Sequence, residues 1–154
     1  MSSLYERVEH MEHLRGMLTQ DMDALRTLFE HLTIADAPTP LQEAAKRSYV
    51  RAFFALVEAL TEQHSQLLVD LARDGNIRLA SDNVLALSDQ TVDVTDTGKL
   101  RSRSMHLPIK SRLRLLYRLA PEALGETIAV DFSGSGWSNF GKALDFRHAL
   151  VHPK

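Results

Sequence analysis

The sequence has no cysteine, which excludes disulfide bonds, thiolate metal ligands and cysteine nucleophiles. It also lacks any run of roughly 18 consecutive apolar residues, the length that a membrane-spanning helix requires. The N-terminal segment carries acidic residues and no apolar centre, so we expect no secretory signal there. The 154 residues are 44% apolar and 25% charged, as in an ordinary globular protein that can bury a core. We expect a single cytoplasmic domain covering residues 1–154.

Positive and negative charges are distributed unevenly along the chain. Residues 1–98 contain 8 Lys and Arg against 16 Asp and Glu, whereas residues 99–154 contain 10 against 4. The net charge of −2 therefore combines an acidic first part with a basic last third. A basic segment favours a polyanionic partner such as nucleic acid, although oppositely charged parts of one chain can equally support self-association.

Apolar residues recur every three or four positions in two long segments, which predicts two amphipathic helices. The first covers about 3–32 and ends before Pro38 and Pro40, because proline breaks a helix. The second covers about 40–74 and ends at Gly75. Its centre, AFFALVEAL, is apolar nearly all round, so we expect it to be buried. Because their connection is short, the two helices should be antiparallel.

The segment of about 76–107 differs in character from the helices on either side. Its β-prone pieces, Ile77–Leu79, Val84–Leu87 and Thr91–Thr95, are separated by Ser, Asp, Asn and Gln turn residues. We therefore predict a short β-hairpin-like or irregular insertion between the second and third long helices.

Two further helices complete the predicted fold. The third long helix runs from Pro108 to Ala120 and is followed by a short helical turn at 121–126. Its core-facing residues should be Leu113, Leu116, Tyr117 and Ala120. The last helix covers about 137–152, because Pro153 disfavours helical geometry at the residue before it. The predicted fold class is thus all-α, a four- to five-helix bundle with one insertion.

The C-terminal string DFRHALVH places Arg147 and His152 with four residues between them, at the end of the last helix. The arginine is followed by polar His148 and then by Ala, Leu and Val. This order of arginine, polar residue, apolar gap and histidine resembles the signature of the HEPN superfamily of small helical nucleases and toxins. The centre of the second helix is also similar to that family, in which an acidic residue often follows the apolar run. Glu58 has this position here.

The resemblance implies a metal-independent endoribonuclease that acts as a toxin or defence effector and needs no cofactor. It also implies a homodimer in which two Arg/His motifs line one cleft, and it allows a nucleotidyltransferase antitoxin as a partner. Arg147 would bind the scissile phosphate, since an arginine presents a fork of donors to phosphate oxygens. His152 would be the general base or acid in attack by the ribose 2′-OH, since histidine has an unperturbed pKa of about 6.5. His148 would help to orient the phosphate.

A basic ridge is predicted on the third long helix, where three cationic residues are spaced by four. The three are Lys110, Arg114 and Arg118. Such a ridge could follow an RNA backbone, or it could be a solvated face that complements the acidic first helix.

Each candidate residue also has a structural interpretation. Arg147 could form an ion pair with Asp145 or Glu58. His152 could cap the last helix through its dipole. Trp137 is better explained as a core or dimer contact than as a platform for stacking bases.

Metal binding is a further alternative, because His148 and His152 are four apart and Asp145 lies one turn earlier. No glutamate adjoins His148 as in a metalloprotease helix, and Pro153 disrupts the last turn, so we predict no metal site.

The spacing of Arg147 and His152 is not specific by itself. The same spacing occurs at Arg26 and His31 and at Arg101 and His106, and only the helical context sets the last pair apart. The alternatives to a nuclease are a non-catalytic HEPN-like interaction module and an unrelated helical bundle. The chain ends two residues after the last histidine, which is compatible with a fragment of a longer protein.

Overall fold

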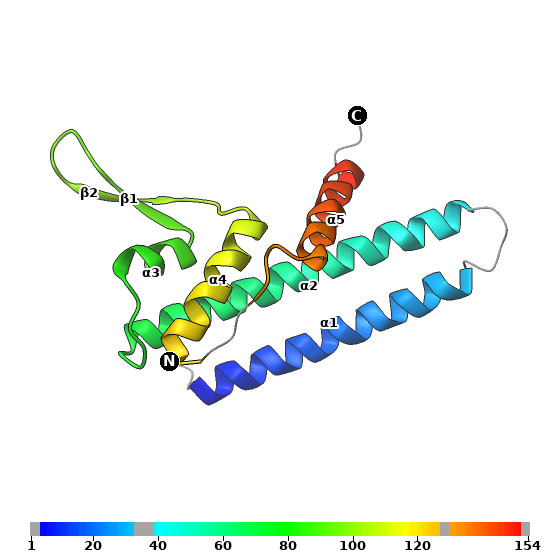
Figure 1. Ribbon diagram of the computed structural model, residues 1–154, viewed down its shortest axis with the longest axis horizontal. Coiled ribbons are helices and arrows are strands. Elements are labelled where there is room, and N and C mark those ends of the chain that lie inside the picture. Colours follow the sequence, from blue (N-terminus) through cyan, green and yellow to red (C-terminus); the bar gives the residue numbers. More distant parts are fainter. Residues whose placement is uncertain (1–3, 33–38, 127–129, 152–154) are drawn as a thin grey trace. The chain divides into compact units, whose positions relative to one another are not determined.

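The computed structural model describes residues 4–32, 39–126 and 130–151. In these residues it has five helices and one two-stranded antiparallel sheet (Figure 1). The elements in chain order are α1 (Leu4–Leu32), α2 (Pro40–Arg73), α3 (Ser81–Leu87), β1 (Gln90–Val94), β2 (Leu100–Ser104), α4 (Ile109–Leu124) and α5 (Ser135–Val151). The fold class is therefore the predicted one: all-helical, with a hairpin in the insertion.

The chain divides into two compact units. The first comprises Met1–Leu60 and Ser133–Lys154 and is named the α1–α5 unit. The second comprises Thr61–Phe132 and is named the hairpin unit. Helix α2 contributes its first part to the α1–α5 unit and its last part to the hairpin unit.

Helix α2 begins at Pro40 because Thr39 and Gln42 form a reciprocal cap. The Thr39 N–H donates to Gln42 Oε1 at 2.6 Å, and the Gln42 N–H donates to Thr39 Oγ1 at 3.2 Å. This arrangement gives partners to N–H groups that a helix cannot bond internally. At the other end Gly75 has φ 77°, and the Asn76 N–H donates to the Leu71 carbonyl at 2.9 Å. These signals explain why the predicted bounds of α2 agree with the structure to within one residue.

In the α1–α5 unit, α1 and the first part of α2 run in opposite directions, as predicted (Figure 1). Apolar residues of α1 spaced by three or four are half-buried at Met11, Leu14, Leu18, Met22 and Leu25, whereas Val8 of the same period is exposed. The segment AFFALVEAL of α2 is less buried than predicted, because Ala55 is exposed and the other residues are half-buried except Phe54, which has no exposed surface. Its ring contacts Phe140 of α5 at 5.7 Å between centroids, and Phe140 stacks on Trp137 at 5.4 Å. Aromatic packing therefore holds α5 against α2.

The core of the hairpin unit is formed by apolar residues of three helices. They are Leu68 and Val69 of α2, Leu87 of α3, and Leu116 and Leu119 of α4. Burial of a side chain of this kind contributes about 1.5–3 kcal/mol. This core holds α3 and α4 on the last part of α2.

Part of the insertion differs from the prediction. The residues Val84–Leu87, predicted as β-prone, lie in α3, because Val84 and Leu87 share one helical face and both pack in the core. Of the piece Thr91–Thr95, all but Thr95 lies on β1 as predicted, where Thr91 pairs with Arg103 and Val94 with Leu100. The piece Ile77–Leu79 forms no strand. The partner strand β2 comes from the basic segment, whose alternating Arg and Ser residues carry no apolar period.

Helix α4 also differs from the prediction in length and in facing. The separate turn predicted at 121–126 continues α4 to Leu124, and Gly125, with φ 70°, ends it. Tyr117, predicted to face the core, is exposed and contacts Phe132 at 6.4 Å between centroids. Leu116 is buried as predicted, and Leu113 and Ala120 are half-buried. The other buried positions, Arg112 and Leu119, were not predicted; with Leu116 they have spacings of four and three.

Replacing Leu119 with Ala should lower the free energy of unfolding by about 2–5 kcal/mol, because it leaves a cavity in the core of the hairpin unit. Leu124→Ala, on the same helix at an exposed position, is the matched control and should change it by less than about 0.5 kcal/mol. Urea unfolding followed by circular dichroism measures both values. Equal losses in the two variants would contradict the assignment of Leu119 to this core.

Candidate functional site

Arg147 of α5 and Glu58 of α2 form a two-point ion pair in the α1–α5 unit. Arg147 Nη1 lies 2.7 Å from Glu58 Oε1, and Nη2 donates to Oε2 at 3.1 Å. Both terminal nitrogens of the guanidinium therefore contact an oxygen of the carboxylate. Such a two-point contact fixes the plane of the guanidinium as well as its position.

Aromatic packing between α2 and α5 helps to position the Arg147–Glu58 ion pair. Phe54 lies one turn before Glu58 on α2, and the guanidinium carbon of Arg147 lies 5.4 Å from the centroid of its ring. A cation over an aromatic face at this distance is attracted by the ring quadrupole. The same ring holds α5 through Phe140, so the contact that packs the two helices also positions the arginine.

The pair is only partly buried, with 26% of the Arg147 side chain and 42% of the Glu58 side chain exposed. Glu58 accepts a hydrogen bond from Nη2 and lies at ion-pair distance from Nη1. Because about a quarter of the Arg147 side chain is exposed, a further acceptor could reach it from solvent. Chemically, the arrangement presents an oriented arginine whose charge is partly offset by a carboxylate.

The other residues predicted for the Arg/His motif are brought together only in part. His148 is exposed on α5, next to Arg147 in the chain. Of the two carboxylates considered as partners of Arg147, the structure pairs it with Glu58, and Asp145 is exposed. His152 lies outside the described residues.

The basic ridge of α4 lies in the hairpin unit. Arg114 and Arg118 are exposed and Lys110 is half-buried, with the predicted spacing of four on one helix. The guanidinium carbon of Arg114 lies 5.8 Å from the centroid of the Phe132 ring.

Arg112, which was not predicted from the sequence, is the buried cation of the hairpin unit. Only 9% of its side chain is exposed, and its two terminal nitrogens bond carboxylate oxygens of Glu62 on α2 and Asp89. Asp89 follows α3 and precedes β1, and it has the left-handed φ of 51°. The spacing of Arg112 from Leu116 and Leu119 was the signal that could have placed it on the buried face.

Within residues 4–32, 39–126 and 130–151, no three His, Asp or Glu side chains are grouped so that they could hold a metal ion. No helix in these ranges combines the length and the apolar character that crossing a membrane requires.

Comparisons with known proteins identify no relative. No protein-family model, no curated protein and no solved structure matches the chain significantly.

Replacing Arg112 with Met should lower the free energy of unfolding by about 1–3 kcal/mol, because it leaves two carboxylates without their cation. Arg103→Met is the matched control: it breaks a pair with Asp93 in which both side chains are exposed, and should cost less than about 1 kcal/mol. Urea titration of both variants measures the difference. If Arg112→Met unfolds at the same urea concentration as Arg103→Met, the buried arginine contributes no more than a surface one.

Proposed function

We propose that the chain is a HEPN-like endoribonuclease that cleaves RNA without a metal ion, working as a homodimeric toxin or defence effector in the cytoplasm. The observation that supports this proposal is the two-point contact between Arg147 and Glu58. These are the arginine of the Arg/His string and the acidic residue of the second helix, which carried the resemblance at separate places in the sequence. They lie 89 residues apart in the chain and meet on the packed faces of α5 and α2.

The proposed reaction is attack of a ribose 2′-oxygen on the adjacent phosphorus. The 2′-OH loses its proton to a base, the new P–O bond forms, and the bond to the 5′-oxygen breaks. That oxygen takes up a proton, so the products are a 2′,3′-cyclic phosphate and a 5′-OH. Arg147 would donate to the non-bridging phosphate oxygens, where negative charge increases in the transition state. His152 would be the general base or acid, and His148 would help to orient the phosphate.

The dimer is part of the proposal for a geometric reason. Five positions along a helix correspond to a rotation of roughly 140°, so side chains at Arg147 and His152 diverge on a regular helix. Two copies of the motif facing each other would place an arginine of one protomer near a histidine of its partner. Glu58 would be a positioning residue, because it restricts the guanidinium before RNA binds and so lowers the entropy lost on binding.

Incubation of labelled RNA with the purified chain in excess EDTA tests the proposal. The chain should cleave the RNA to products with 2′,3′-cyclic phosphate ends, and Arg147→Ala or His152→Ala should each reduce the rate at least about 100-fold. Arg26→Ala and His31→Ala are the matched controls, because this pair has the same spacing on α1. They should retain the activity of the unmodified chain.

Two results would contradict the enzyme. One is cleavage that survives in both Arg147→Ala and His152→Ala, since the activity would then come from elsewhere. The other is cleavage that EDTA abolishes, since the proposed reaction uses no metal ion.

The second candidate is a non-catalytic HEPN-like module that pairs with itself or with a nucleotidyltransferase antitoxin. The observation that favours it is the same ion pair, because a carboxylate that offsets the charge of Arg147 also suits a purely structural contact. Sedimentation velocity together with the cleavage assay separates the two candidates. A stable dimer without cleavage at any RNA concentration supports the module.

A further inference from the structure

The positive charge of the chain is concentrated on one continuous stretch of the hairpin unit. From Thr97 to Pro121 the sequence has seven Lys and Arg and no Asp or Glu. One of the seven, Arg112, is buried and bonded to two carboxylates. The other six are Lys99, Arg101, Arg103, Lys110, Arg114 and Arg118. They lie on α4, on β2 and in the turn before β2.

The two faces of the hairpin differ in composition. In the antiparallel register Thr91 is opposite Arg103 and Asp93 is opposite Arg101, so these four share a face. The opposite face carries no charge and each of its residues is exposed; it consists of Gln90, Val92, Val94, Leu100, Ser102 and Ser104. Every residue of β2 is exposed, so its arginines are not there to complete a core.

The carboxylate of Asp93 orients one of these arginines. Arg103 Nη1 donates to Asp93 Oδ2 at 2.8 Å, which uses one of its five donors. Arg101 lies two residues earlier on the same strand, a separation of roughly 7 Å. The turn adds the exposed Lys99, so three cations follow one another along this edge.

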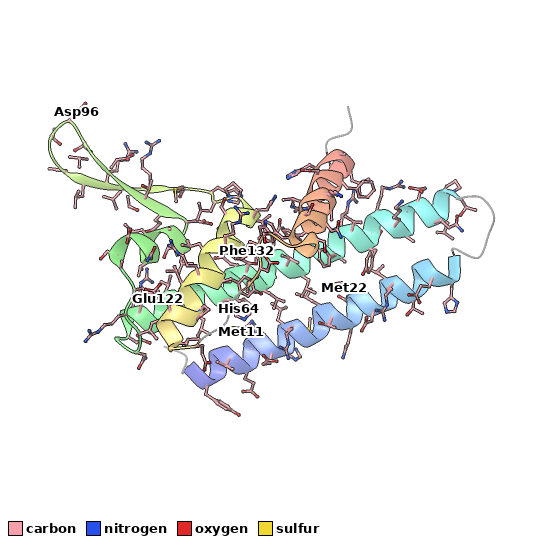
Figure 2. The ribbon with its side chains drawn as sticks, viewed as in Figure 1. Met11, Met22, His64, Asp96, Glu122 and Phe132 are labelled. Atoms are coloured by element: carbon pink, nitrogen blue, oxygen red, sulfur yellow. The ribbon has the colours of Figure 1, made fainter. Side chains whose placement is uncertain are left out.

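The base of the hairpin is held by hydrogen bonds, although its strands bury little apolar surface. A two-stranded hairpin is marginally stable by itself in water. Here the Met105 N–H donates to the Asp89 carbonyl at 2.8 Å, and the carboxylate of Asp89 bonds Arg112. At the tip, Gly98 has φ 75° and its N–H donates to the Thr95 carbonyl at 2.8 Å. Figure 2 labels Asp96 at this tip, away from α3 and α4 of the same unit.

We propose that the β1–β2 hairpin is an RNA-binding arm, in which Lys99, Arg101 and Arg103 contact the phosphates of a single strand and extend the basic ridge of α4. Arginines spaced along a strand can each present two donors to successive phosphates. The attraction to a polyanion follows from the charge of the stretch, and the choice of RNA rests on the proposed function. The buried Arg112 acts as a positioning residue that holds the arm on α4.

A competing explanation is that the charges only protect an exposed strand edge from pairing with another chain. Protection of this kind works with charge of either sign. Charge reversal therefore separates the two explanations, because acidic residues would still protect the edge but would repel RNA.

The test measures binding of a fluorescent, 20-nucleotide 2′-O-methyl RNA, which lacks the attacking hydroxyl and cannot be cleaved by the proposed reaction. Anisotropy titrations at several salt concentrations compare the chain with Lys99→Glu/Arg101→Glu and with Lys99→Gln/Arg101→Gln. The matched control is Arg73→Glu/Arg78→Glu, which makes the same change of charge at exposed positions of the same unit, outside the basic stretch. Circular dichroism confirms that each variant is folded.

Reversal at the arm should raise Kd at least about tenfold near 0.1 M salt. In both arm variants the slope of log Kd against log salt should decrease by about 1.4, the value for two lost phosphate contacts on a single strand. The control should bind within about twofold of the unmodified chain. Unchanged affinity in the arm reversal, or an equal loss in the control, would overturn the proposal. Displacement of the RNA by polyglutamate at equal charge concentration would overturn the assignment to RNA.

The outcome is independent of the cleavage assay. If the chain cleaves no RNA but its RNA binding depends on the arm, the nuclease proposal is contradicted and the proposal of an RNA-binding arm is supported. If it cleaves RNA and the arm variants bind normally, the arm fails and the nuclease stands.

Discussion

Carboxylates on α2 form ion pairs with arginines from distant parts of the sequence, and the positions of these arginines depend on the ion pairs. Glu58 holds Arg147 in the α1–α5 unit, and Glu62, one turn further along the same helix, holds Arg112 in the hairpin unit. Removing a cation from water costs free energy unless a carboxylate pairs with it. Each ion pair therefore favours the one position of its helix along α2 in which the arginine reaches its carboxylate. Apolar packing is less directional than an ion pair, so by itself it would fix the position of one helix along another less strictly.

The two ion pairs differ in exposure, and this difference indicates which of the two arginines a ligand could reach. The side chain of Arg112 is 9% exposed and that of Arg147 is 26% exposed. Arg112 uses both ends of its guanidinium on two carboxylates, which leaves little for a ligand. Arg147 shares its guanidinium with one carboxylate, and both side chains of this pair are partly exposed. An arginine held in this way is more rigid than a free surface arginine and more accessible than a buried one.

Local signals in the sequence predicted the long helices well, and long-range contacts explain the errors. The proline and capping residues around Thr39 and the glycine at position 75 act within a few residues, so they set the ends of α2 directly. Whether Val84–Leu87 is strand or helix depends on the core of the hairpin unit, which no local pattern contains. The burial of Arg112 depends in the same way on two carboxylates, one of them 50 residues away. The charge pattern of the sequence therefore offered no reason to separate Arg112 from the other cations of the basic segment.

The three Arg/His pairs of equal spacing show what the structure adds to a sequence motif. Arg26 lies on α1 and makes exposed bridges to Asp23 and Glu30 of its own helix, contacts that any solvated helix can form. Arg101 lies on an exposed strand. Among the three, and within the described residues, Arg147 alone bonds a carboxylate from another helix, over a buried aromatic ring. That contact needs matching residues on both α2 and α5, whereas the spacing of an arginine and a histidine can arise on one helix by chance. The proposal for an RNA-cleaving site therefore depends on the contact and not on the spacing.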